Sequence, residues 1–419
     1  MILLVITFIL GSGIAVLTPA WHAIVPSLVE KKDLLAALSL NSIGINISRA
    51  IGPGLAGFII VTFGLAYPFF INGLSYVIIF LALLVWQDKS APARDSSPER
   101  PVRAILTGIS FARKSVPLKN TIKRALLFFL FASAFWALLP LIAKDLIAGG
   151  PSLYSYMMAS IGMGAVAGAL VLPKIRQHFE ASQIAFIGSM GTVLAMLLFA
   201  LSDNSTIGLV ASFFAGLSWI TCLTSFHISA QTALPEWIRA RGLSVFIVVF
   251  FGALSLGSIS WGGVASLFGI REALFIAAGL LLIASLYGRK FELQLGDKLD
   301  IYPSSHWPAP APKKDLQGTE GPILVTVLYR VVKTSEKEFL KLINTLKNSR
   351  LRDGAYKWEL FEDVETPGRF VESFRNDTWA DHLRMHKRVS GEDKKLQEKI
   401  LKLLKKGTKP TVTHMKHHR

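Results

Sequence analysis

Three ionisable side chains within the apolar segments of this chain could bind a charged ligand or transfer a proton. Arg49 lies inside a long apolar stretch, and a cation near the centre of a membrane helix costs about 2.5–3.5 kcal/mol. We therefore expect it either to bind an anionic ligand in a wet cavity or to pair with backbone carbonyl groups. His22 and His227 each follow an aromatic residue. An imidazole titrates near neutral pH and could couple to protons, or each histidine could be a hydrogen-bonded residue near a helix end.

Amide side chains form a second group of candidates for contact with a transported molecule. They could donate hydrogen bonds into a cavity or join neighbouring helices. They are Asn41, Asn46 and Gln231.

Small residues mark the positions where we expect helices to pack closely or to bend. Gly52, Pro53 and Gly57 follow one another within six positions, and Gly257 and Gly262 have a similar spacing further along the chain. Small residues allow membrane helices to approach backbone to backbone, and neighbouring helices can satisfy a proline kink. The pattern predicts either a tight packing seam or a helix that also helps to open a transport pathway.

A third group of candidates lies in the polar C-terminal part of the chain. Trp379, His382 and His386 share one face of a predicted helix. They could line a ligand or haem pocket, or close a dimer face. The later histidines (His414, His417 and His418) fit a basic tail better than a metal site. The sequence therefore predicts no bound metal and no resident cofactor.

The elements that must position these residues are mainly membrane helices. The 419 residues are 52% hydrophobic and only 17% charged, which excludes an ordinary soluble domain. About 20 apolar residues span a bilayer, and runs of this length predict nine helices. They cover residues 2–26, 37–63, 66–86, 123–148, 153–175, 181–202, 205–232, 240–268 and 270–288.

Basic residues predict the orientation of these helices. Of the 18 Lys and Arg residues before Arg289, 15 fall in segments that alternation places on one side, which we expect to be the cytoplasm. Lys144 and Arg271 fall on the opposite side. The membrane thus accounts for the basic excess of residues 1–288, where 18 Lys and Arg residues face 10 Asp and Glu residues, and the rest of the net charge of +17 lies beyond them. The basic residues are not interleaved with aromatic residues as they are in a nucleic-acid-binding groove, so nucleic acid is not expected as a partner.

The chain also contains an internal repeat. A shift of 205 residues aligns His22 with His227, Gly52 with Gly257 and Gly57 with Gly262. Parallel repeats on either side of a basic loop are typical of two-bundle secondary transporters. In the second copy, about 85 residues, from residue 121 to 205, precede the position that aligns with Met1. The first copy contains no residues that match them.

Three stretches carry a resemblance to a known family. They read PAWHAIVPSLV (19–29), LAALSLNSIGINISRAIGPGLAGF (35–58) and FFINGLSYV (69–77). They resemble the transmembrane secretion effector branch of the major facilitator superfamily, which includes enterobactin exporters. The resemblance implies two six-helix bundles and an antiporter-like motif at Gly52 and Pro53, and it places Met1 at the fourth family helix. Either the start codon is assigned internally or the gene is truncated, and the upstream reading frame decides between these.

Beyond a linker at 291–321, alternating patterns predict a soluble ferredoxin-like α+β domain at 322–419. We expect strands at 323–331, 355–363, 368–376 and 411–415, and helices at 336–349, 379–388 and 392–405. Residues 352–389 resemble the antibiotic-biosynthesis-monooxygenase-like domain. That resemblance implies dimerisation and, in some relatives, haem degradation, although the first strand lacks the asparagine used by haem-degrading relatives.

Together these observations predict an all-α polytopic membrane protein that lacks about three N-terminal helices and carries a ferredoxin-like domain. Residues 1–87 form the rest of the first bundle, 88–122 a cytoplasmic loop, and 123–290 the second bundle. The predicted function is proton-coupled export of a siderophore or drug across the bacterial cytoplasmic membrane, with no enzymatic activity and with the C-terminal domain in the cytoplasm. The alternatives are a membrane-anchored monooxygenase-like or dimerisation module, or a non-functional truncated transporter.

Overall fold

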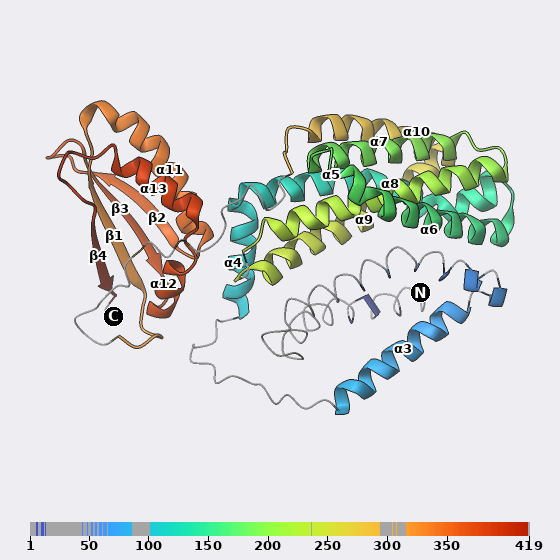
Figure 1. The fold of residues 1–419 in the computed structure, drawn as a ribbon, viewed down its shortest axis with the longest axis horizontal. Helices are drawn as coiled ribbons and strands as arrows, with labels where there is room; N and C mark the ends of the chain where they lie inside the picture. The colour runs from blue at the N-terminus through green and yellow to red at the C-terminus, as the bar shows by residue number, and fades with distance from the viewer. Residues whose placement is uncertain are drawn as a thin grey trace. The chain divides into compact units, whose positions relative to one another are not determined.

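The computed structural model describes residues 66–85, 101–235, 237–293 and 316–417, together with isolated positions before residue 65 and residues 304 and 307. Within these residues, seven helices are long and apolar enough to cross a membrane. The two helices predicted at 2–26 and 37–63 lie almost entirely outside the described residues. The other seven predicted spans are confirmed as helices (Figure 1).

The described membrane helices begin and end close to the predicted residues. They are α3 (Ala66–Val85), α5 (Val116–Leu141) with the π-helical turn η2 (Ile142–Leu146), α6 (Gly150–Ile175), α7 (Ala181–Ala200), α8 (Ser205–Thr232), α9 (Arg239–Phe268) and α10 (Ile270–Gly288). Helix α3 has no buried residue, whereas α5 to α8 bury about half of their apolar windows.

One helix was not expected. The segment 88–122, predicted as a polar loop, contains helix α4 (Pro101–Lys114), and α5 begins at Val116 rather than at residue 123. A proline suits the first turn of a helix, because its missing N–H would have no partner there, and the basic residues Arg113 and Lys114 suit the last turn. Because this segment contains several proline and serine residues, its short amphipathic helix was not predicted from the sequence.

Helices α6 and α8 approach each other backbone to backbone. A methyl group added at Gly164 of α6 would overlap the carbonyl oxygen of Phe213 on α8, and one added at Gly216 of α8 would overlap the carbonyl oxygen of Ile161 on α6. Ser160 Oγ also donates to Leu209 O at 2.8 Å across this seam. Small residues that permit such contact are typical of membrane helix interfaces.

The chain divides into two compact units. The first comprises Met1–Pro92, Asn120–Ile228 and Phe246–Leu293, and the second comprises Ala93–Lys119, Ser229–Val245 and Gln294–Arg419. Within the second unit, α4 packs on helix α11 (Glu336–Arg352), where Ser110 Oγ donates to Leu351 O at 3.0 Å.

The C-terminal domain is a four-stranded antiparallel sheet covered on one face by helices (Figure 1). The strands are β1 (Ile323–Arg330), β2 (Tyr356–Glu362), β3 (Arg369–Asn376) and β4 (Thr411–Lys416), in the order β2-β3-β1-β4; the helices are α11, α12 (Trp379–His386) and α13 (Gly391–Leu401). All four predicted strands are confirmed, and so are the three helices predicted at 336–349, 379–388 and 392–405.

The core of this domain follows from two periodicities. Alternate residues of β1, including Val325 and Val327, are buried on one face of the sheet, as expected for a strand whose successive side chains point to opposite faces. Phe339, Ile343 and Leu346 recur at helical spacing on α11 and are buried in the same apolar cluster. The sheet and α11 therefore form one core around the site described below.

Candidate functional site

His227 lies on α8 in an aromatic environment. Its Nδ1 is 3.1 Å from Leu223 O, one helical turn earlier, and its ring packs edge-on against Phe246 and Phe250 of α9, with ring centroids 5.1 and 6.1 Å away. This geometry corresponds to a hydrogen-bonded histidine on a helix. Gln231, one turn further along, is exposed.

The predicted glycines differ in what surrounds them. A methyl group at Gly257 of α9 would overlap Ser133 Oγ and Leu130 O of α5, so this glycine allows two helices to meet. Trp261 Nε1 donates to the same Leu130 O at 2.9 Å. At Gly52 and Gly262, no described atom lies within 4 Å of an added Cβ.

The remaining predicted transport residues lie outside the described part of the chain. They are His22, Asn41, Asn46, Arg49, Pro53 and Gly57. Their proposed roles stay predictions.

A buried cation in the membrane unit was missed at the sequence level. Arg124 on α5 is 5% exposed, and its Nη2 donates to Ser182 O at 2.6 Å at the start of α7. Its Nη1 reaches Phe291 O, just beyond α10, at 3.5 Å. Arg124 therefore links α5 to the start of α7 and to the residues that follow α10. The sequence showed only a basic residue at the predicted inner end of a helix.

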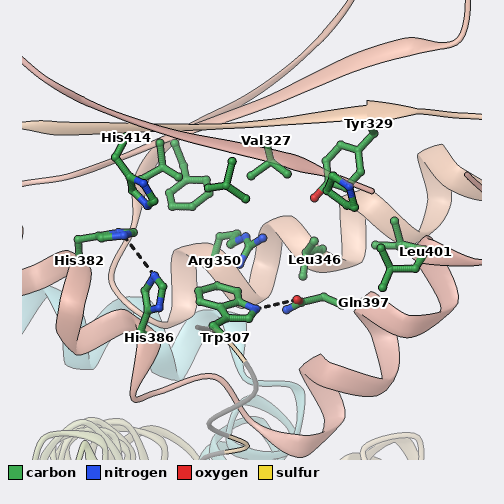
Figure 2. Close-up of a pocket in the computed structure, with 15 residues that line it drawn as sticks. Trp307, Val327, Tyr329, Leu346, Arg350, His382, His386, Gln397, Leu401 and His414 are labelled. Atoms are coloured by element: carbon green, nitrogen blue, oxygen red, sulfur yellow. Dashed lines mark hydrogen bonds between the residues drawn. The ribbon is translucent and has the colours of Figure 1, made fainter. Parts of the chain in front are cut away.

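The C-terminal domain contains a cavity between its sheet and its helices (Figure 2). Its volume is about 240 Å³, slightly below the roughly 300–1,000 Å³ typical of sites for drug-sized ligands. Valine, leucine and phenylalanine side chains make up much of its wall. The functional groups that reach it are the Arg350 guanidinium, three imidazoles and the polar ends of Tyr329 and Gln397.

Arg350 lies buried in the wall of this cavity. The side chain comes from α11, is 6% exposed, and lies over the rings of Trp307 and Phe374 at 4.5 and 5.1 Å from their centroids. Its Nε donates to Glu372 Oε1 at 3.0 Å. Two aromatic faces and one carboxylate thus fix the guanidinium plane.

Glu372 on β3 is fully buried and accepts from three side chains. Besides Arg350, the donors are Tyr329 OH at 2.8 Å and Trp358 Nε1 at 2.9 Å. Burial, and then the nearby Glu372 charge, raise the pKa of Tyr329 well above its ordinary value, so the hydroxyl keeps its proton and donates.

Three histidines meet at one end of the cavity. His382 Nε2 lies 3.2 Å from His386 Nε2, and the ligand atoms of His382, His386 and His414 all lie within 4.8 Å of one another (Figure 2). His382 Nδ1 is 3.2 Å from Asn376 Oδ1. Burial lowers the pKa of His382 to about 3 and also lowers the pKa of His414. Trp379 is buried beside this cluster, with its ring centroid 5.3 Å from that of His382.

The grouping of Trp379, His382 and His386 on one helical face is thus observed, but the sequence did not predict the other functional groups of the cavity, which include Arg350 and His414. His414 was assigned to the tail. The structure brings it to α12 because β4 pairs with β1, opposite Val325. In the sequence, Arg350 is one of several basic residues near the end of α11. Only its helical spacing from Ile343 and Leu346 indicated that it lies on the buried face of the helix.

Comparison with known proteins identifies the family. The family model described as transmembrane secretion effector matches residues 1–419. The chain belongs to the transmembrane secretion effector family. This family and its curated relatives are transporters of the major facilitator type and not enzymes, so the chain is a multi-pass membrane transporter.

Two curated relatives show how far the similarity extends. The chain is 26% identical to the staphyloferrin A transporter of Staphylococcus aureus over 67% of this chain and 71% of that protein. It is 25% identical to the enterobactin exporter EntS of Escherichia coli over 63% of both proteins, less than two thirds of the exporter's length. A crystal structure of a bacterial homologue of the human lysosomal transporter Spinster matches 65% of this chain and 74% of its own, with 13% identity and a TM-score of 0.45, too low to support an argument.

Proposed function

We propose that this transporter is a secondary active exporter that moves a small organic molecule, such as a siderophore or a drug, out of the bacterial cytoplasm. The observation that carries this proposal is the family match over the whole chain. The names of the curated relatives, a staphyloferrin A transporter and an enterobactin exporter, support siderophores as the first cargo class to test.

Protons are the proposed coupling ion. His227 lies in an apolar, aromatic environment on α8, where protonation would introduce a charge next to Phe246 and Phe250. A charge there is costly unless water or a partner compensates it. A change in its protonation would therefore favour one arrangement of α8 and α9 over another.

The proposed architecture is a two-bundle transporter with a ferredoxin-like domain in the cytoplasm. The strand order β2-β3-β1-β4 and the element order β1-α11-β2-β3-α12-α13-β4, which is the βαββαβ pattern with two helices before its last strand, support the ferredoxin-like assignment. The excess of basic residues in the segments on one side of the membrane supports the cytoplasmic location. Homodimerisation through this domain is proposed from the resemblance of residues 352–389 alone.

The test is complementation of an Escherichia coli strain that lacks its enterobactin exporter. Cells expressing the chain should secrete enterobactin and retain less of it than cells with an empty vector, and a protonophore should abolish the difference. Staphyloferrin A and hydrophobic dyes are assayed in parallel, with membrane levels of the chain measured by immunoblot. Equal retention of every compound with the chain present in the membrane would contradict export.

A further inference from the structure

The three-histidine cluster in the C-terminal cavity has the features of a metal-binding site. The imidazoles come from two separate elements: His382 and His386 lie one turn apart on α12, and His414 lies on β4. All three line the same cavity. The sheet and the helix thus bring together three side chains that the sequence separates by up to 32 positions.

The distances are close to those of a ligand set. In a tetrahedral zinc site with Zn–N bonds of about 2.0–2.1 Å, two ligand nitrogens lie about 3.3 Å apart. His382 Nε2 and His386 Nε2 are already 3.2 Å apart. The widest separation within the cluster, at most 4.8 Å, must shorten by about 1.5 Å. His414 lies on β4, an edge strand of the sheet, and is only partly buried, so rotation of its side chain can supply that movement.

Asn376 orients the central ligand. Its Oδ1 is the acceptor for His382 Nδ1–H at 3.2 Å, which leaves the lone pair of His382 on Nε2, directed toward His386. Ligating histidines characteristically donate their second N–H to such an outer partner. Without metal, the proton between the two Nε2 atoms belongs to His386, and the neutral imidazole carries it on Nδ1 instead when both Nε2 atoms bind one ion.

The chemistry of the ligands restricts the ion. The described cluster contains three imidazoles and no carboxylate or thiolate. Imidazole suits zinc, copper, nickel and iron, whereas magnesium and calcium require oxygen ligands. Three protein ligands leave a fourth position for water or another ligand, and this position would border the cavity that also contains the Arg350 guanidinium.

We propose that His382, His386 and His414 bind one divalent transition-metal ion, with zinc as the reference ion, at the end of this cavity. The site goes beyond the proposed export function, which does not require it. A small ligand with a negatively charged donor atom could then bind to the metal and to Arg350 together. The cavity volume of about 240 Å³ fits a ligand of a few heavy atoms.

The test uses the full chain, without a polyhistidine tag, purified in detergent and freed of metal by a chelator. Titration with Zn²⁺ by calorimetry should show one site per chain. His414→Ala should weaken the binding by about tenfold or more, because loss of even an outer partner of a ligand typically costs 10–100-fold. Its matched control is His417→Ala/His418→Ala, which removes two histidines of the same tail and should leave the affinity unchanged.

A second measurement separates a tetrahedral site from adventitious binding. Co²⁺ in place of Zn²⁺ should give the intense visible absorption of a four-coordinate complex, and both His414→Ala and His386→Ala should abolish it. Circular dichroism of each variant shows whether the domain is still folded. No Zn²⁺ binding, or binding that depends on the tail pair rather than on His414, would overturn the proposal and leave the three imidazoles as a hydrogen-bonded cluster.

Discussion

Replacing Glu372 with glutamine tests the main electrostatic argument about the C-terminal cavity. The substitution keeps the shape of the side chain but removes the carboxylate charge that accepts a hydrogen bond from the buried Arg350. Removing one partner of a buried ion pair typically costs about 3–5 kcal/mol, because the other charge stays desolvated. Stabilities of whole domains are only about 5–15 kcal/mol, so we expect a severe loss.

The assay is brief proteolysis of the full chain in detergent across a urea series, followed by detection of the C-terminal domain. A loss of about 3–5 kcal/mol with an m-value near 1–1.5 kcal/mol/M lowers the unfolding midpoint by roughly 2–5 M. Asp363→Asn is the matched control, because it removes the carboxylate of an exposed pair with Arg369 and should leave the midpoint unchanged.

The double variant Arg350→Met/Glu372→Gln completes the cycle. With the cation also removed, no buried charge is left unpaired, and the glutamine oxygen can still accept from Tyr329 or Trp358. We therefore expect the double variant to be more stable than Glu372→Gln alone. A midpoint of Glu372→Gln equal to that of Asp363→Asn would refute the reasoning.

Three further predictions concern other parts of the chain. Burial raises the pKa of Asp353 to about 6; the folded domain therefore holds this proton more tightly than the unfolded chain does, and the contribution of Asp353 to stability should fall by up to about 3 kcal/mol as the pH rises from 4 to 7. The lowered pKa of His382 acts in the opposite direction in both chains, so the test is the difference in urea midpoint between the parent chain and Asp353→Asn, which should change by the contribution of Asp353 across that range. Gly216→Leu should prevent α6 and α8 from packing and reduce the folded yield in detergent, measured by size-exclusion chromatography, whereas Gly263→Leu, with no described atom within 4 Å of an added Cβ, should not. Arg49→Ala should abolish export at unchanged membrane levels if Arg49 binds the cargo, and full export by this variant would remove Arg49 from the site.

Elements with a strong period could be predicted from the sequence. Strand β1 alternates buried and partly exposed positions, and each predicted strand boundary in the C-terminal domain lies within one or two residues of the observed one. The membrane helices could also be predicted, because an apolar run of about 20 residues is rarely anything other than a membrane-spanning helix. Helix α4 was missed since a short amphipathic pattern beside proline and serine residues is a weak signal.

The candidate site was only partly predictable, because tertiary pairing assembles it. The spacing of His382 and His386 shows that they share a helical face. Nothing local shows that β4 brings His414 to them or that Glu372 lies under Arg350. Such contacts depend on the register of β1 with β3 and β4, which is set by the packing of the whole domain.

The paired glycines of α6 and α8 also restrict how this bundle can move. Where two backbones touch, no side chains are available to repack, so a sliding motion of the kind that accompanies many domain closures would be blocked there. Helices α6 and α8 should therefore travel as one rigid block during alternating access. The rearrangement must then fall at contacts made by larger side chains, such as the aromatic rings between α8 and α9.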